Sequence, residues 1–129
     1  MSRAEIEQGL QKAGVRTAQR HLFLCLGPDC CSPSEGEETW KYMKQRVKEL
    51  DLRVMRTKTL CFRICSVGPW LVVYPDGVWY AQVRASDVPE IIEEHLLNGR
   101  VVERLALMKV PCAGGVASAE VSDDGAWEA

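Results

Sequence analysis

Residues 21–57 contain a strand, a helix and a second strand in that order, and this succession constrains the fold more than any other feature. Residues 21–24 are a short apolar run, His-Leu-Phe-Leu, that stops before Gly27-Pro28, as a buried strand does. Residues 52–57 predict the second strand. Between them, four apolar residues recur at offsets of 3, 4 and 3 and define one face of a helix from Glu37 to Leu50: Trp40, Met43, Val47 and Leu50. Such a crossover makes the two strands parallel, with a right-handed connection.

A hairpin and a final helix follow this unit. Residues 71–74 and 78–80 are β-branched or aromatic, and they flank the turn Pro75-Asp76-Gly77. Ser86 is a good N-cap for a helix that ends at Asn98-Gly99. The order β-α-β-β-β-α predicts an α/β protein with a thioredoxin-like core and a mixed sheet of four to five strands.

The length of 129 residues corresponds to one domain. We expect residues 1–20 to form an N-terminal helical arm and residues 21–108 to form the folded domain. Residues 109–129 become rich in Gly, Ala and Ser and acidic from Ala113 onward, which predicts a disordered tail. Cys112 lies in this tail, and we expect it to be a dispensable thiol.

Composition excludes several classes of protein. The 16 Lys and Arg against 18 Asp and Glu argue against a nucleic-acid binder, which carries a basic excess. No apolar run approaches the roughly 20 residues that span a membrane, and no secretory signal is visible, so we expect a cytoplasmic, reducing environment. Because the sequence has no paired carboxylates, nucleophile triad or phosphate loop, we do not expect an enzyme.

Two groups of cysteines carry the functional information. Cys25 is followed by Cys30 and Cys31, and Cys61 by Cys65. Both groups lie in loops after strands, and the ends of parallel strands meet at one edge of a sheet, so we expect the two groups to converge. The residues alone allow an iron–sulfur cluster, a structural zinc or inert thiols, although the Cys-x2-Cys spacing common in zinc sites is absent.

Two histidines could also be ligands, as in Rieske centres, but their positions favour structural or surface roles. His21 precedes a strand, and His95 lies in the last helix, away from both cysteine loops.

The cysteine motifs and the hairpin together resemble the thioredoxin-like [2Fe–2S] ferredoxins, small bacterial electron carriers related to the small [2Fe–2S] subunit of complex I. The resemblance extends from about His21 to Leu105, and its most specific part joins residues 61–69, Cys-Phe-Arg-Ile-Cys-Ser-Val-Gly-Pro, to residues 72–80, Val-Val-Tyr-Pro-Asp-Gly-Val-Trp-Tyr. It implies a one-electron carrier with a [2Fe–2S] cluster, redox partner proteins and a homodimer. The alternatives are a subunit of a larger oxidoreductase and a zinc-stabilised binding module.

The resemblance also implies four cysteine ligands: Cys25, Cys31, Cys61 and Cys65. Cys31 is preferred to Cys30 because the family's second ligand lies nine residues before a large apolar residue of the first helix, and Trp40 is nine residues after Cys31. The backbone N–H groups of Gly27 and of residues 66–68, together with Arg63, are candidates to offset the negative charge of the site.

Two surface features have an ordinary and a functional interpretation. The stretch from Lys41 to Arg63 holds eight Lys and Arg with two acidic residues. A solvated helix face is the default for such a run, and an acidic redox partner is the alternative. Trp40, Trp79 and Tyr80 are expected to fill the core or an interface rather than line an electron route, and residues 78–83 offer exposed aromatics for a dimer contact.

Overall fold

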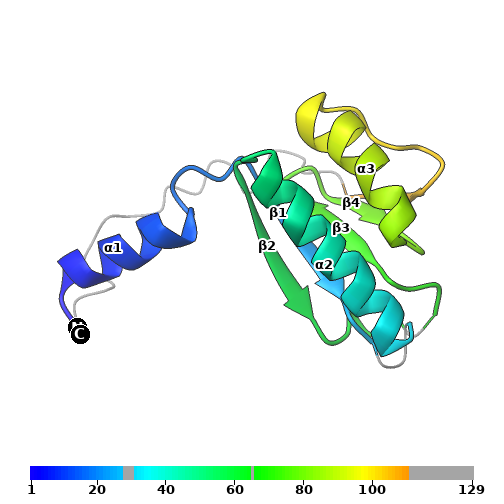
Figure 1. Cartoon of the computed structure of the whole chain (residues 1–129), viewed down its shortest axis with the longest axis horizontal. Coiled ribbons are helices and arrows are strands. Elements are labelled where there is room, and N and C mark those ends of the chain that lie inside the picture. The colour runs from blue at the N-terminus through cyan, green and yellow to red at the C-terminus, as the bar shows by residue number, and fades with distance from the viewer. Residues whose placement is uncertain (28–30, 65, 111–129) are drawn as a thin grey trace.

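The computed structural model describes residues 1–27, 31–64 and 66–110 (Figure 1). Its strands are β1 (Arg20–Cys25), β2 (Val54–Thr59), β3 (Leu71–Tyr74), β4 (Val78–Tyr80) and β5 (Ala106–Lys109). Its first two helices are α1 (Arg3–Ala13) and α2 (Pro33–Glu49). The last helical segment begins as a 3-10 turn (Ala85–Asp87), passes through α3 (Val88–Glu90) and continues as a π-helix (Ile91–Leu97). None of these helices is long and apolar enough to cross a membrane.

The strands form one five-stranded sheet in the order β2-β1-β3-β4-β5. β1 and β2 are parallel, and every other neighbouring pair is antiparallel. This arrangement confirms the α/β class, the thioredoxin-like core and the mixed sheet. The fifth strand was not predicted as a strand, because its four residues, Ala-Leu-Met-Lys, are mostly exposed and carry no alternating apolar pattern.

Both α2 and the last helical segment cover one face of the sheet (Figure 1). Met43 and Val47 of α2 share a buried cluster with Ile91 and Leu96 of the last helix and with alternate residues of the central strands: Leu22, Leu24, Leu71, Val73, Val78 and Tyr80. Alternate residues of a strand point to opposite faces, so the intervening residues lie on the other face, which neither helix covers. These include Phe23, Cys25, Val72 and Trp79.

The boundaries of α2 and β2 differ from those expected. Ser32 caps α2, since its hydroxyl accepts a hydrogen bond from the N–H of Glu35, and Pro33 occupies the first turn, so the helix begins four residues before Glu37. Its other end is closed by a hydrogen bond from the N–H of Leu52 to the carbonyl oxygen of Val47. Leu52 therefore belongs to the end of the helix, and β2 begins at Val54.

The aromatic residues of the segment 78–83 are not exposed as expected, and Trp79 is half-buried. Tyr80 is fully buried, and Val83 lies beyond the strand and is buried as well. Only Trp79 faces the uncovered side of the sheet, where its ring packs edge-on against Phe62 and Trp70. The expectation of an exposed Tyr80 is wrong, because its strand position turns it toward the helices, where it takes part in the core.

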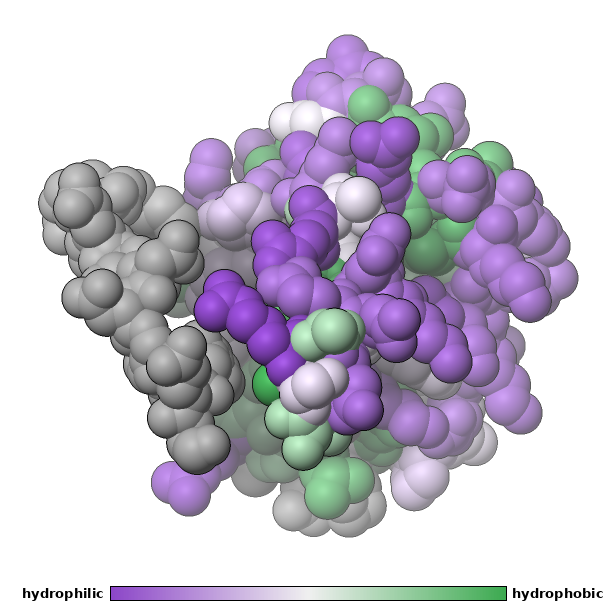
Figure 2. Space-filling model, turned by 90° about the vertical axis from the view of Figure 1, so that its left-hand side faces the viewer, coloured by the Kyte–Doolittle hydropathy of each residue, from purple (hydrophilic) through white to green (hydrophobic). Residues whose placement is uncertain are grey.

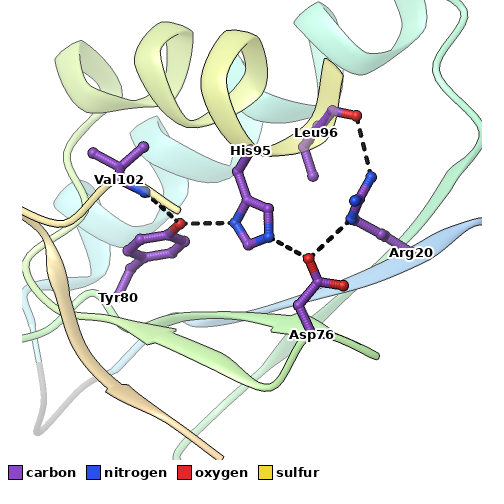
Figure 3. A network of polar contacts seen from close by, with 6 residues as sticks. All are labelled: Arg20, Asp76, Tyr80, His95, Leu96 and Val102. Atoms are coloured by element: carbon purple, nitrogen blue, oxygen red, sulfur yellow. Dashed lines mark hydrogen bonds and ion pairs between the residues drawn. The ribbon is translucent and has the colours of Figure 1, made fainter. Parts of the chain in front are cut away.

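A network of polar contacts lies at the end of the sheet opposite Cys25 (Figure 3). The ring of His95, which is fully buried, lies 2.7 Å from the Tyr80 hydroxyl at Nδ1 and 2.5 Å from the Asp76 carboxylate at Nε2. Arg20 also binds Asp76, at 3.2 Å, and the N–H of Val102 donates to the Tyr80 hydroxyl. His95 therefore has the structural role that its position predicted.

Candidate metal centre

Three of the cysteines in the two predicted groups lie in the described residues, at the end of the sheet where β1 and β2 stop. Cys25 is the last residue of β1 rather than part of the following loop, and it is fully buried. Cys31 immediately precedes the N-cap of α2 and is half-buried, and Cys61 follows β2 and is exposed. Cys30, Cys65 and Cys112 lie outside the described residues.

The two ends of the first cysteine loop lie close together, with Cys31 beside Cys25. The Sγ of Cys31 lies 4.0 Å from the carbonyl oxygen of Cys25. Gly27 makes this possible: its φ is +86°, and a Cβ at this position would lie 2.4 Å from the carbonyl oxygen of Cys31 and 3.6 Å from its Sγ. The loop therefore needs glycine both for its backbone conformation and for space beside Cys31.

The start of α2 is held close to the same loop. A Cβ at Gly36 would lie 3.0 Å from the Cα of Leu26, so only glycine lets the helix approach β1 this closely. The N–H of Leu26 donates to the carbonyl oxygen of Thr59 at 2.8 Å, which joins the end of β1 to the end of β2. The crossover thus brings the two cysteine groups to one end of the sheet, as the strand–helix–strand order predicted.

A small apolar cluster supports this end of the sheet from the uncovered face. Cys25, Trp70 and Ala81 are its buried members. Its half-buried members come from both cysteine groups and from β4: Cys31, Phe62, Ile64 and Trp79. Phe62 and Ile64, which lie between the two cysteines of the second group, are therefore packed against the cluster that contains Cys25.

Backbone N–H groups donate to two of the sulfur atoms. The N–H of Trp70 lies 3.0 Å from the Sγ of Cys25, and the N–H of Arg63 lies 2.9 Å from the Sγ of Cys61. Such donors favour the charged thiolate, which is the form that binds a metal. Trp70 was missed by sequence reasoning because a strand pairing sets its position, whereas Arg63 was expected to act through its charge.

The donor set suits a thiolate-bound group. Two of the three described sulfur atoms accept N–H hydrogen bonds, and the third, that of Cys31, lies beside Gly27, where there is no room for a Cβ. Within residues 1–27, 31–64 and 66–110, no three His, Cys, Asp or Glu side chains already lie close enough together to hold a metal ion. The described part of the site therefore holds sulfur ligands at one end of the sheet, and two of the candidate ligands lie outside it.

The two histidines occupy structural positions. The His21 ring stacks on Phe23 with centroids 4.1 Å apart, and its Nε2 lies 2.7 Å from the Thr57 hydroxyl. Burial lowers the pKa of His21, so the ring is neutral at pH 7. His95 lies in the polar network at the other end of the sheet.

Comparisons with known proteins agree with this arrangement, although no family model matches the chain. A 2Fe-2S ferredoxin of Clostridium pasteurianum is 43% identical over 101 residues, which are 69% of this chain and 96% of the relative. A 2Fe-2S ferredoxin of Aquifex aeolicus is 36% identical over 100 residues, which are 70% of this chain and 90% of the relative.

Solved structures extend the likeness to the fold. The structure of a thioredoxin-like [2Fe-2S] ferredoxin from Aquifex aeolicus superposes with a TM-score of 0.66 at 35% identity, and the match covers 76% of this chain and 98% of that one. The identity and the coverage are both high enough to establish kinship. The chain belongs to the thioredoxin-like [2Fe–2S] ferredoxins.

Proposed function

We propose that this protein is a one-electron carrier that holds a [2Fe–2S] cluster and works between redox enzymes, without transforming a substrate itself. The observation that carries the proposal is the pair of N–H···S hydrogen bonds to Cys25 and Cys61, at the end of the sheet where the cysteine groups meet. Membership of the ferredoxin family supports it. When bound, such a cluster accepts and releases single electrons.

We propose that the ligands are Cys25, Cys31, Cys61 and Cys65, with Cys30 as the alternative to Cys31. The tight contact of Cys31 with the loop at Gly27 supports Cys31. Solved structures of the Aquifex aeolicus ferredoxin include serine variants of two cysteines four positions apart, the spacing of Cys61 and Cys65 in this chain. Residues 21–108 would form the electron-transfer domain.

The residues around the sulfur atoms have defined tasks in this proposal. Four thiolates and the cluster have a formal charge of about −2, and reduction adds one more negative charge. The N–H groups of Arg63 and Trp70 point at this charge and stabilise it, most of all in the reduced state. Trp70 and Phe62 shield Cys25 from water.

The test is the visible spectrum of the purified protein, together with iron and sulfide counts. We expect a red-brown protein with two iron and two sulfide per chain that bleaches partly with dithionite. A colourless protein with one zinc per chain would support the zinc-stabilised module instead. The comparisons do not favour that alternative or a subunit of a larger oxidoreductase.

We also propose that the protein is a cytoplasmic homodimer and that the contact involves β5. This edge strand exposes two large apolar side chains, Leu107 (65% exposed) and Met108 (59%), and Met108 pairs with Trp79 of β4. An apolar edge strand favours pairing with another chain.

Light scattering of the purified protein should give twice 14.4 kDa, and the variant Leu107→Glu should give the monomer. Leu97→Glu, at an apolar residue of similar exposure in the last helix, is the control. A monomeric wild type would contradict the proposal.

A further inference from the structure

Five exposed basic residues lie on α2, on the edge strand β2 and just after that strand, and we call them the basic edge: Lys41, Lys44, Lys48, Lys58 and Arg63. Three of them lie on α2 at spacings of 3 and 4, so they form one stripe along the helix. Glu37, four residues before Lys41, continues this stripe, and its carboxylate lies 4.0 Å from the Nζ of Lys58. The stripe on α2 therefore runs beside the edge strand β2.

The packing of Lys58 confirms which side of α2 borders the edge strand. Its Nζ lies 5.9 Å from the centre of the Trp40 ring, and Trp40 packs against the buried core below α2. Figure 2 looks onto the side of the molecule where α1 projects and β2 is the outermost strand, and hydrophilic residues cover most of this side. All five residues of the basic edge are exposed to solvent.

Of the five residues of the basic edge, Lys58 is the one paired with a carboxylate in the described part of the chain. Among the described residues, Lys41, Lys44, Lys48 and Arg63 have no carboxylate within 4.0 Å. Outside residues 41–63, four of the eight basic residues form ion pairs with carboxylates: Arg16, Arg20, Arg100 and Arg104.

Positive charge is concentrated in the part of the sequence that contains the basic edge. Residues 41–63 hold eight basic and two acidic residues, a net charge of +6, and the rest of the chain holds eight basic and 16 acidic residues, a net charge of −8. The segment that contains the basic edge is thus strongly positive in a protein whose net charge is −2.

The basic edge reaches the candidate metal centre at the end of β2. Cys61 is the exposed member of the three described cysteines, whereas Cys25 is fully buried. Leu60, which precedes Cys61, is 76% exposed. An electron leaves most readily at the ligand nearest the surface, and an exposed leucine beside that ligand offers an apolar contact to a partner protein.

The basic edge extends too far to serve only to offset the negative charge of the cluster. The stripe from Lys41 to Lys48 spans seven residues, or about 10 Å of helix, and it leads away from the start of α2, where Cys31 lies. Lys48 sits in the last turn, at the far end of a 17-residue helix. At that distance, solvent screens its effect on the cysteine site.

We propose that the basic edge is the docking surface for an acidic redox partner protein, which covers Leu60 and exchanges electrons beside Cys61. This inference rests on the proposed function as an electron carrier and names the class of partner. Opposite charges steer the encounter and orient the two proteins, and the contact breaks easily because exposed charges are screened by salt. Leu60 favours a protein over a nucleic acid, because it offers an exposed apolar contact beside Cys61.

The probe is a gold electrode coated with a carboxylate-terminated monolayer, which stands in for the acidic partner. Adsorbed mass is measured with a quartz crystal microbalance, and electron transfer by voltammetry of the same film at pH 7. We expect wild-type protein to adsorb at low salt despite its negative net charge, to give a voltammetric wave, and to desorb as salt is raised. The double variant Lys41→Gln/Lys44→Gln should adsorb about three- to tenfold more weakly.

The matched control is Lys12→Gln/Lys109→Gln, which removes two exposed charges from α1 and from the opposite edge strand β5. Because Lys109 lies in β5, light scattering is used to check that the variant has the same oligomeric state as wild type, and at equal oligomeric state it should adsorb like wild type. Equal losses in both double variants, or stronger adsorption and a stronger wave on an ammonium-terminated monolayer, would overturn the proposal. Binding of a short double-stranded DNA that is lost in Lys41→Gln/Lys44→Gln would overturn it in favour of a nucleic acid.

The two readouts separate this proposal from the proposed function. A protein that lacks a cluster gives no wave on either monolayer and no visible absorption, but its adsorbed mass still reports whether the basic edge binds an acidic surface. A protein with a full visible spectrum whose adsorption ignores the basic edge remains an electron carrier and lacks this docking surface.

Discussion

The backbone N–H of Trp70 donates a hydrogen bond of 3.0 Å to the Sγ of Cys25, across 45 positions of the sequence. The bond follows from the antiparallel pairing of β1 with β3, since the N–H of Cys25 donates in turn to the carbonyl oxygen of Trp70 at 3.1 Å. The register of the sheet therefore fixes both the place of this sulfur and the dipole that stabilises its charge. Substitution of the Trp70 side chain alone leaves this dipole in place.

Gly27→Ala tests the tight loop between Cys25 and Cys31. Positive φ costs a residue with a side chain about 1–2 kcal/mol, and the new Cβ would meet the carbonyl oxygen of Cys31. We expect the loop to open and the iron content per chain to fall, measured by metal analysis and visible absorption after identical purification.

Gly9→Ala is the control for that substitution. Gly9 lies within α1, and a Cβ there meets nothing within 4 Å. It should leave the iron content unchanged, and alanine should favour the helix by up to about 1 kcal/mol. A normal iron content in Gly27→Ala would mean that the loop geometry does not hold the cluster.

The choice between Cys30 and Cys31 is tested by the two single serine variants. We expect Cys31→Ser to lose most of the cluster and its reduced-state signal, and Cys30→Ser to keep both, because the packed register of α2 holds Cys31 beside the Gly27 loop. Neighbouring residues seldom reach the same iron. The opposite pattern would make Cys30 the ligand, and a full cluster in both variants would mean that either cysteine can serve.

Asp76→Asn tests the polar network at the other end of the sheet (Figure 3). Burial raises the pKa of the Asp76 carboxyl, but the hydrogen bond from His95 and the charge of Arg20 outweigh it and hold the pKa below its usual value. The carboxylate therefore stabilises the fold above pH 3.8, and this contribution is lost as the pH falls through the lowered pKa. We expect the variant to lose about 1–2 kcal/mol of unfolding free energy at pH 7.

The pH dependence distinguishes this explanation from a general defect. The difference between wild type and Asp76→Asn in urea unfolding should shrink as the pH falls below 3.8. Glu49→Gln, which removes an exposed carboxylate paired with Arg46, should match wild type throughout. A difference that stays constant down to the lowest pH would show that the charge of Asp76 is not what stabilises the network.

Local patterns predicted the parts of this fold that local interactions determine. The spacing of Trp40, Met43 and Val47 predicted α2, and Pro75-Asp76-Gly77 predicted the turn between β3 and β4. The helix start was missed because the capping role of Ser32 is clear only when the following proline is assigned to the first turn.

Features that depend on the register of the sheet could not be predicted in the same way. The burial of Tyr80 and the outward position of Trp79 follow from the pairing of β4 with its neighbours. The N–H of Trp70 and the link from Arg20 to Asp76 join residues more than 40 positions apart. The cysteine motifs predicted the kind of site, and the fold supplied the hydrogen bonds that tune it.

The most direct test of the electron-carrier account is quantitative electron paramagnetic resonance on the full chain reduced with dithionite. Reduction of a [2Fe–2S] cluster by one electron leaves one unpaired electron, so we predict about one spin per chain and no signal in the oxidised protein. A reduced protein with its cysteines intact and no spin would contradict the account, since a zinc site or inert thiols accept no electron.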